Sequence, residues 1–323
     1  MRSQATIQEW LSENTGKRPL GARLSSAVWG ATLLLAAASA SSAALAAETE
    51  PPERVIFPSA DGKTSLVGYV FEPGDAGSGP HPAVVLMHGR GGAYSTNAHG
   101  VYDAATLSAR HQAWGHEWAA HGYVALLVDG FGPRGYAQGF PRHSYDERPA
   151  ELDEVAIRPM DAYGGLAYLR SRSDVAPARI GLMGWSNGAS AALAAMAWNA
   201  PGLKWPHAKP AFRAALAFYP GCRLKGRFDE KPLRPSASVL ILHGTDDEEV
   251  ASEHCVELAE KSRSAGGTVE IELFEGATHG FDSPTASRQA LDANRTAATE
   301  ATERALEFFD RHVKGQASGG GDD

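Results

Sequence analysis

Short apolar runs recur along the chain, and from residue 80 onward they alternate with longer segments of helical spacing. Apolar runs bounded by Gly, Pro, Asn or Asp predict strands, and stretches rich in Ala, Leu and Glu predict helices. The predicted strands are residues 54–57, 66–71, 83–87, 123–128, 179–185, 214–219, 239–242 and 269–274. The predicted helices are residues 113–121, 159–171, 189–198, 252–265 and 287–313.

This order of elements predicts an α/β fold, with one mostly parallel sheet of eight strands and helices on both faces. Asp61-Gly62, a hairpin signal, joins the first two strands, whereas the later strands alternate with helices. Only residues 220–238 separate two of these strands, at a place where related folds insert a lid, so we expect no separate cap domain. In such a sheet, ligands bind outside the carboxyl ends of the strands.

The strand at residues 179–185 stops at a serine and gives way at once to an alanine-rich helix. Gly184-Trp-Ser-Asn-Gly188 at this junction fits the Gly-x-Ser-x-Gly nucleophile elbow. Glycine is needed two residues to either side of the serine, because side chains there would collide across so sharp a turn. The turn places the Ser186 hydroxyl at a helix N-terminus, where developing negative charge is stabilised. The alternative is a glycine-rich turn of some other α/β protein.

Two other strand ends carry the partners that a nucleophilic serine needs. A serine hydroxyl must give its proton to a base, and the base is usually oriented by a carboxylate. Asp246 and Asp247 follow the strand at 239–242, and His279 follows the strand at 269–274. Serine, acid and histidine therefore occur in the chain order of α/β-hydrolases.

The loops around these residues resemble the dienelactone hydrolase family, which implies an α/β-hydrolase fold. Gly244, Asp247 and Val250 match the Gly-x-x-Asp-x-x-Val loop that holds the acid in this family, and this favours Asp247 over Asp246. His279-Gly-Phe281 matches the turn that holds the base. The resemblance therefore implies a catalytic triad made of a serine, Asp247 and His279.

The resemblance extends over residues 54–313, with one departure at the nucleophile. The family's namesake enzymes have Cys where this chain has Ser186, and the serine favours ordinary ester hydrolysis over cleavage of a dienelactone. An oxyanion hole needs two backbone N–H donors. Asn187 supplies one by its position, and His88-Gly-Arg-Gly-Gly92, which resembles the family's His-Gly-x motif, assigns the second to Arg90.

Other polar residues near strand ends have a structural interpretation. His88 and His243 each precede a glycine at the end of a strand, and we interpret both as structural rather than as bases. Arg158 and Asp161 are spaced to pair on one helix face and are also interpreted as structural.

Two long irregular segments, residues 88–111 and 129–157, are expected to form the walls of the substrate pocket. Their aromatic side chains predict a cleft that accepts apolar or aromatic groups. The candidate pocket residues are Tyr94, Phe131 and Trp185, with His99, Tyr136, Phe140 and Tyr145 as further aromatic or polar residues of the same segments.

The N-terminal residues have the pattern of a secretory signal peptide. Basic residues precede an apolar stretch at 27–38, and an Ala-x-Ala site, Ala44-Leu-Ala46, lies in the small residues that end at Ala47. We therefore expect a signal peptide over residues 1–47, a hydrolase domain over 48–314, and a disordered Gly/Ser/Asp-rich tail over 315–323. The alternative is an uncleaved membrane anchor, although the alanine-rich stretch is weakly apolar for a stable span.

The two cysteines fit an exported protein. Cys222 follows the strand at 214–219, and Cys255 lies early in the helix after the next strand. Adjacent parallel strands bring these two ends together, so a disulfide is expected in an oxidising compartment, either the periplasm or the exterior. The alternative is two buried, unpaired thiols.

Together these features predict a serine hydrolase that cleaves small carboxylic esters or lactones, with no cofactor and no metal. The net charge of −8 argues against nucleic acid as a partner, and the oligomeric state is left open. Two alternatives are a small peptidase of the oligopeptidase type and a non-catalytic binding protein on a hydrolase scaffold.

Overall fold

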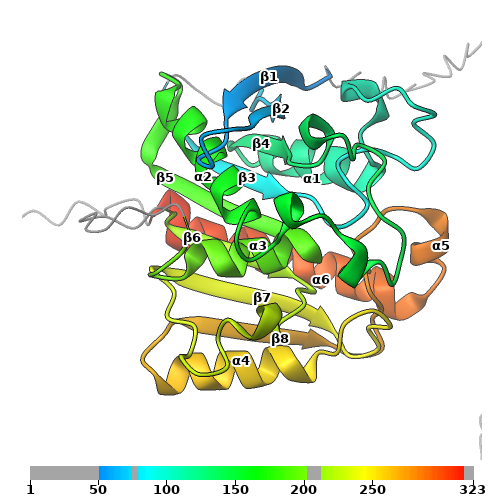
Figure 1. Cartoon of the computed structure of the whole chain (residues 1–323), viewed down its shortest axis with the longest axis vertical. Coiled ribbons are helices and arrows are strands. Elements are labelled where there is room, and N and C mark those ends of the chain that lie inside the picture. The colour runs from blue at the N-terminus through cyan, green and yellow to red at the C-terminus, as the bar shows by residue number, and fades with distance from the viewer. Residues whose placement is uncertain (1–50, 75–78, 202–211, 316–323) are drawn as a thin grey trace, which may run out of the picture. The chain divides into compact units, whose positions relative to one another are not determined.

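One eight-stranded sheet runs through the molecule in the order β1-β2-β4-β3-β5-β6-β7-β8 (Figure 1). The computed structural model describes residues 51–74, 79–201 and 212–315. The expected signal peptide and all but the first residue of the expected tail lie outside them. The strands are β1 (Glu53–Pro58), β2 (Ser65–Phe71), β3 (His81–Met87), β4 (Val124–Asp129), β5 (Val175–Trp185), β6 (Ala214–Phe218), β7 (Ser238–Gly244) and β8 (Val269–Phe274).

The pairing of the strands confirms the predicted mostly parallel sheet. β1 pairs with β2, and β2 with β4, in antiparallel register. All the remaining neighbours, from β4 through β3 to β8, are parallel. The carboxyl ends of β3, β5, β6, β7 and β8 therefore share one edge of the sheet, and the loops that follow them can meet there.

Helices cover both faces of the sheet. The helices are α1 (Ala109–Ala120), α2 (Arg158–Ser171), α3 (Asn187–Met196), α4 (Glu253–Ser264), α5 (Ala286–Gln289) and α6 (Asp292–Phe309). One core contains buried residues of α2, α3 and α4, and a second core contains residues of α1 and α6. Alternate residues of β3 enter the two cores, with Val85 and Met87 in the first and Val84 and Leu86 in the second. This explains the continuous apolar run of a strand that is buried on both faces.

Two elements differ from the predicted boundaries. The helix expected at residues 287–313 is divided into α5 and α6, because Leu291 has extended backbone angles (φ −89°, ψ 123°), and the last turn, Asp310–Lys314, is π-helical. α1 begins four residues earlier than the predicted 113, at Ala109, because the Ser108 hydroxyl accepts a hydrogen bond from the His111 backbone N–H. Such capping satisfies a donor that the helix itself leaves unpaired.

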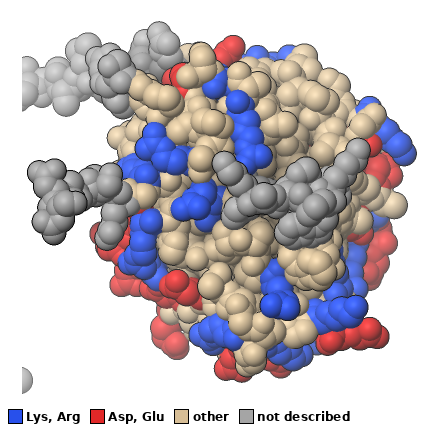
Figure 2. All heavy atoms as spheres, turned by 90° about the vertical axis from the view of Figure 1, so that its left-hand side faces the viewer, with Lys and Arg blue, Asp and Glu red and all other residues tan. Residues whose placement is uncertain are grey.

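Residues 219–237 form a short connection between β6 and β7, and its only helical element is the 3₁₀ turn Leu224–Gly226. Among the described residues no helix combines the length and apolarity needed to cross a bilayer. On the face drawn in Figure 2, basic and acidic side chains are interspersed with uncharged surface.

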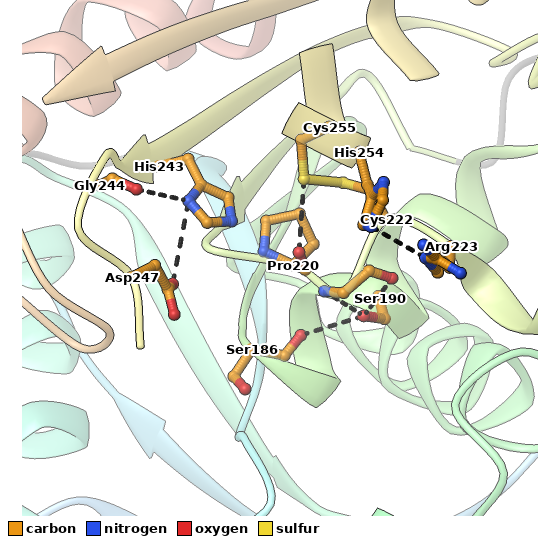
Figure 3. The surroundings of a disulfide bond; sticks show 11 residues. Ser186, Ser190, Pro220, Cys222, Arg223, His243, Gly244, Asp247, His254 and Cys255 are labelled. Atoms are coloured by element: carbon orange, nitrogen blue, oxygen red, sulfur yellow. Dashed lines mark hydrogen bonds and ion pairs between the residues drawn. A yellow bond between two sulfur atoms is a disulfide. The ribbon is translucent and has the colours of Figure 1, made fainter. Parts of the chain in front are cut away.

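Cys222 and Cys255 form a disulfide, as the sequence predicts. Their Cα atoms lie 5.0 Å apart, and the bond ties the β6–β7 connection to the first turns of α4 (Figure 3). The Ser190 hydroxyl, on the first turns of α3, accepts a hydrogen bond of 3.0 Å from the Gly221 backbone N–H. The disulfide therefore fixes a loop that also contacts the helix after Ser186.

Replacing both cysteines by serine is expected to destabilise the fold. A bridge that closes a loop with a sequence separation of 33 contributes roughly 3–4 kcal/mol on the chain-entropy model. Urea unfolding followed by circular dichroism measures the loss. Reductant should move the wild-type curve towards that of C222S/C255S and leave the variant's own curve in place. Equal midpoints for the oxidised wild type and the variant would contradict the prediction.

Candidate active site

Ser186 sits on a strained turn between β5 and α3. Its backbone has φ +52° and ψ −118°, a left-handed φ that few residues other than glycine adopt. A Cβ atom on Gly184 would lie 2.3 Å from the carbonyl oxygen of Gly188, and a Cβ atom on Gly188 would lie 2.1 Å from that of Met87. Both glycines of the elbow are thus required by close backbone approach.

The three residues assigned to a triad form one continuous hydrogen-bonded chain. His279 Nε2 lies 3.0 Å from Ser186 Oγ. On the other side of the ring, His279 Nδ1 lies 2.8 Å from Asp247 Oδ2 and 3.1 Å from Oδ1. A carboxylate on Nδ1 sets the tautomer in which Nε2 accepts a proton from the serine. The Tyr219 ring packs edge-on against the imidazole, with 4.7 Å between ring centroids.

The structure places Asp247, rather than Asp246, against His279. Asp247 Oδ1 accepts hydrogen bonds of 2.9 Å from the backbone N–H groups of Glu249 and Val250, and its side chain is 1 % exposed. Asp246 is exposed, and its carboxylate accepts a hydrogen bond from the Thr245 hydroxyl.

Both residues assigned to the oxyanion hole lie beside the nucleophile. Asn187 is the first residue of α3, and its side-chain oxygen accepts a hydrogen bond of 2.5 Å from Arg158, which is fully buried. A Cβ atom on Gly89 would lie 3.5 Å from Ser186 Cβ, so the loop after β3 passes close to the elbow. Arg90 and Asn187 also line the same cavity as Ser186.

His88 and His243 are buried at strand ends, which agrees with the structural role expected for both from the sequence. His88 is fully buried; its Nδ1–H donates to the Gly89 carbonyl oxygen (2.7 Å), and its Nε2 accepts from the Gly130 N–H (3.2 Å). Burial lowers the pKa of His88 well below its ordinary value and also lowers that of His243, whose Nδ1 lies 3.8 Å from Asp247 Oδ2 (Figure 3). Both imidazoles are therefore neutral and hold strand ends in place.

Arg158 and Asp161 lie on α2 but have different partners. The Asp161 carboxylate pairs with Arg134 at 2.8 Å and also accepts a hydrogen bond from the Ser59 hydroxyl. Arg158 instead donates to the side-chain oxygen of Asn187. The hydrogen-bonded pair that the i, i+3 spacing favoured does not form, and each side chain binds a different partner.

Ser186 and Asn187 line a cavity of about 860 Å³. Its walls come from the loop at residues 143–154, the β6–β7 connection, residues 249–251 and α4. The apolar wall residues are Tyr145, Leu224, Phe228, Val250 and Leu258, and Cys222 of the disulfide lies among them. Charged side chains also line the cavity: Arg90, Arg148, Glu154, Arg223, Lys225, Asp229, Glu249, Glu257 and Lys261. The volume suits a small organic molecule.

The three predicted pocket residues do not line this cavity, and that prediction is wrong. Phe131 and Trp185 are fully buried and Tyr94 is 6 % exposed, so all three belong to the core. The Tyr94 hydroxyl donates to Asp129, and the Trp185 indole N–H donates to Asp282. Of the other loop residues named from the sequence, Tyr145 lines the cavity.

Sequence reasoning missed Asp282, a buried carboxylate three residues after His279. The indole N–H groups of Trp114 (2.9 Å) and Trp185 (2.8 Å) donate to one of its oxygens, and the Tyr219 hydroxyl donates to the other at 2.5 Å. Arg110 Nε lies 3.2 Å from the carboxylate. One side chain thus links the strand that ends at the nucleophile with the ring that packs on His279. Its place in the His279 turn was the only signal in the sequence.

Glu248 and Glu249 were missed as well, although both lie in the acidic run that includes Asp247. Glu248 accepts a hydrogen bond of 2.9 Å from the His279 backbone N–H, and Glu249 Oε2 lies 3.8 Å from His279 Nε2. Among residues 51–74, 79–201 and 212–315, no group of three or more His, Cys, Asp or Glu side chains is placed to hold a metal ion.

A parallel sheet with a serine elbow, an acid and a histidine at its carboxyl edge defines an α/β-hydrolase. The chain belongs to the dienelactone hydrolase family, whose model matches residues 66–313, and this membership identifies the protein as a hydrolase.

Individual relatives are more distant. A probable 2-oxo-3-(5-oxofuran-2-ylidene)propanoate lactonase of a Bradyrhizobium species is 25 % identical over 181 residues, or 50 % of this chain; the match spans 64 % of the lactonase. The thermophilic esterase Est2 of Thermogutta terrifontis, solved with propionate bound, shares 22 % identity over 81 % of this chain and 96 % of that chain, with a TM-score of 0.55. The dienelactone hydrolase-like promiscuous phosphotriesterase P91 from metagenomic libraries shares 20 % sequence identity. The match covers 80 % of this chain and 97 % of that chain, with a TM-score of 0.59. These structures share the fold.

The buried neutral histidines predict a loss of stability in mild acid. Burial lowers the pKa of His111 to about 4, and it also lowers those of His88 and His243. In the unfolded chain each histidine has a pKa near 6.5, so below that pH it binds a proton that the buried histidine of the folded protein does not bind. Stability is therefore full above about pH 6.5 and falls from there towards pH 4, by up to about 1.4 kcal/mol per pH unit for each histidine.

Urea unfolding measured at several pH values between 7.5 and 4.5 tests this expectation. The variant His111→Asn removes one of the three groups and should show a shallower fall than the wild type. An identical pH dependence in the two proteins would contradict the role assigned to His111.

Proposed function

We propose that this hydrolase cleaves carboxylic esters or lactones through an acyl-enzyme intermediate on Ser186. The observation that supports the proposal best is the unbroken chain from Ser186 Oγ through the His279 ring to Asp247, with distances of 3.0 and 2.8 Å. In this arrangement the serine has a base within hydrogen-bond reach, and the carboxylate already holds that base in the required orientation.

In the first half of the reaction, Ser186 Oγ attacks the acyl carbon while His279 Nε2 takes the hydroxyl proton. Asp247 stabilises the imidazolium that forms. The backbone N–H groups of Asn187 and Arg90 hold the oxyanion of the tetrahedral intermediate, and removing one such donor typically raises the barrier by about 3 kcal/mol. His279 then returns the proton to the departing alcohol oxygen, and the acyl group stays on Ser186.

In the second half, a water molecule takes the place of the alcohol. His279 removes a proton from the water, which attacks the acyl carbon, and the same two N–H groups hold the second oxyanion. The C–O bond to Ser186 breaks, His279 returns the proton to Ser186 Oγ, and the carboxylic acid leaves. In a lactone the alcohol and the acid belong to one molecule, so the product is a single hydroxy acid.

The cavity beside Ser186 supports a small-molecule substrate. Its apolar wall, which includes Leu224, Phe228 and Leu258, suits the hydrocarbon part of an ester. The name of the lactonase relative adds support for lactones as an alternative to open-chain esters.

The triad is tested with p-nitrophenyl esters and aminoacyl anilides as parallel substrates. We expect hydrolysis of the esters, with kcat reduced by roughly 10⁴-fold or more in Ser186→Ala, His279→Ala and Asp247→Asn. Asp246→Asn is the matched control, because the neighbouring carboxylate is exposed and lies away from His279. Preference for the anilides would support a peptidase.

A fluorophosphonate probe separates the enzyme from a non-catalytic binding protein. Labelling is expected on the wild type and absent from Ser186→Ala. A folded wild-type protein that the probe leaves unlabelled would contradict the proposal and favour the binding protein.

We further propose that residues 1–47 are an export signal and that the mature enzyme acts in the periplasm or outside the cell. The Cys222–Cys255 disulfide supports this, because such bonds persist in oxidising compartments. N-terminal sequencing of protein exported by a bacterial host is expected to start near Ala47 or Glu48. Full-length protein recovered only in the membrane fraction would contradict cleavage and support an anchor.

A further inference from the structure

Three consecutive acidic residues reach His279 from three sides. Asp247 binds the ring at Nδ1, Glu248 accepts the backbone N–H, and Glu249 Oε2 lies 3.8 Å from Nε2. Only Asp247 belongs to the triad, so the other two carboxylates have no role in the reaction described above. Glu249 is the one that faces the reacting side of the imidazole.

Glu249 is held firmly in that place by Arg90. Arg90 Nε donates to Glu249 Oε2 at 3.0 Å, and Arg90 Nη2 donates to Oε1 at 2.9 Å, a bidentate pair. The Glu249 side chain is 12 % exposed and that of Arg90 is 23 % exposed. A partly buried, bidentate pair keeps its geometry far better than an exposed one. Arg90 is also the residue whose backbone N–H is assigned to the oxyanion.

The ion pair therefore joins two loops that the reaction requires to stay in register. Glu249 lies two residues after Asp247, in the loop after β7, and Arg90 lies three residues after the end of β3. Arg90 Nη1 also donates to the Phe140 carbonyl oxygen at 3.0 Å, which attaches the oxyanion loop to the segment just before the wall residues 143–154. Movement of either loop would stretch both hydrogen bonds of the pair.

Glu249 carries its negative charge within a group of mixed charges. Burial alone would raise the pKa of Glu249, but the hydrogen bond from Arg90 and the charges of His279, Arg90 and Arg142 outweigh it and lower the pKa. The other groups around Glu249 and His279 are Asp247, Glu248, Arg110, Arg148, Arg288, Tyr219 and His243.

We propose that Glu249 is a positioning residue of this active site with two effects. It fixes the side chain of Arg90, and with it the oxyanion loop, to the loop that carries the acid. Its carboxylate also stabilises the imidazolium that forms on His279 during each proton transfer. The inference rests on the proposed function, because it requires His279 to act as the base.

The two effects predict different changes in the kinetics of Glu249→Gln. Loss of the bidentate pair is expected to lower kcat about 10-fold with little change in KM, because the oxyanion forms only after substrate has bound. Loss of the charge makes protonation of His279 less favourable, so the acid limb of the kcat/KM profile should move to lower pH by about half a unit or more.

Arg90→Met provides the opposite electrostatic change at the same place. It keeps the backbone N–H but separates Glu249 from Arg90 and leaves Arg142 as the partner of Glu249, so the acid limb is expected to move to higher pH while kcat again falls. Glu260→Gln is the matched control: this residue is exposed on α4, does not line the cavity, and should leave both kcat and the acid limb unchanged.

The decisive result is the direction of the two shifts. Acid limbs that move in opposite directions in Glu249→Gln and Arg90→Met support the proposal, and limbs that stay in place or move together overturn it. If circular dichroism shows that Glu249→Gln or Arg90→Met is unfolded, the variant Arg142→Met is measured in place of both. Arg142 is 42 % exposed and lies 2.8 Å from Glu249, so the limb should move to higher pH, and an unmoved limb overturns the proposal.

Failure of the underlying function gives a different pattern. If the wild type lacks ester hydrolysis, or Ser186→Ala retains it, the proposed function itself falls. If the wild type is active, Ser186→Ala is inactive and the Glu249 variant behaves as the Glu260 control does, only the role of Glu249 falls.

Discussion

The hydrogen bond between Ser186 Oγ and His279 Nε2 joins residues 93 positions apart in the chain, and the rest of the site depends on it. It forms because β5, β7 and β8 are parallel and end at one edge of the sheet, where the elbow, the acid loop and the histidine turn meet. The strained backbone of Ser186 is the local cost of presenting the hydroxyl at that edge, and close packing of Gly184 and Gly188 maintains the strain.

Residues whose role depends on local backbone geometry could be predicted from the sequence. The elbow around Ser186 has a fixed spacing, and the acid and the base follow apolar strands that periodicity locates. Tyr94, Phe131 and Trp185 show the limit of such reasoning, because a loop aromatic turns inward or outward according to distant partners. The contacts of Asp282 and Glu249 were likewise out of reach, since each joins side chains from separate loops. The break at Leu291 was missed because the helical pattern continues across it.

Several polar groups close to the nucleophile are buried at a cost in stability. Among the described residues, Arg158 Nε and Nη2 and Asn187 Nδ2 are buried without a hydrogen-bond partner. Burial lowers the pKa of Arg158 to about 10, yet the guanidinium stays charged at neutral pH, directly behind the residue that begins α3. Unsatisfied groups of this kind are rare in protein interiors and are found more often where a site must be organised before its ligand arrives.

The carboxylate of Asp282 accepts three hydrogen bonds, from α1, β5 and the loop after β6, and forms an ion pair with Arg110 of α1. No single neutral side chain of similar size accepts that many bonds, so evolutionary change at any of the five positions is coupled to the other four. Trp114 and Arg110 lie on α1, which carries none of the reacting groups. Changes at these two positions are nevertheless restricted by their contacts with Asp282. In related enzymes the cavity walls should therefore change more readily than the buried cluster around Asp282. Leu224 and Phe228 of the wall do not belong to that cluster.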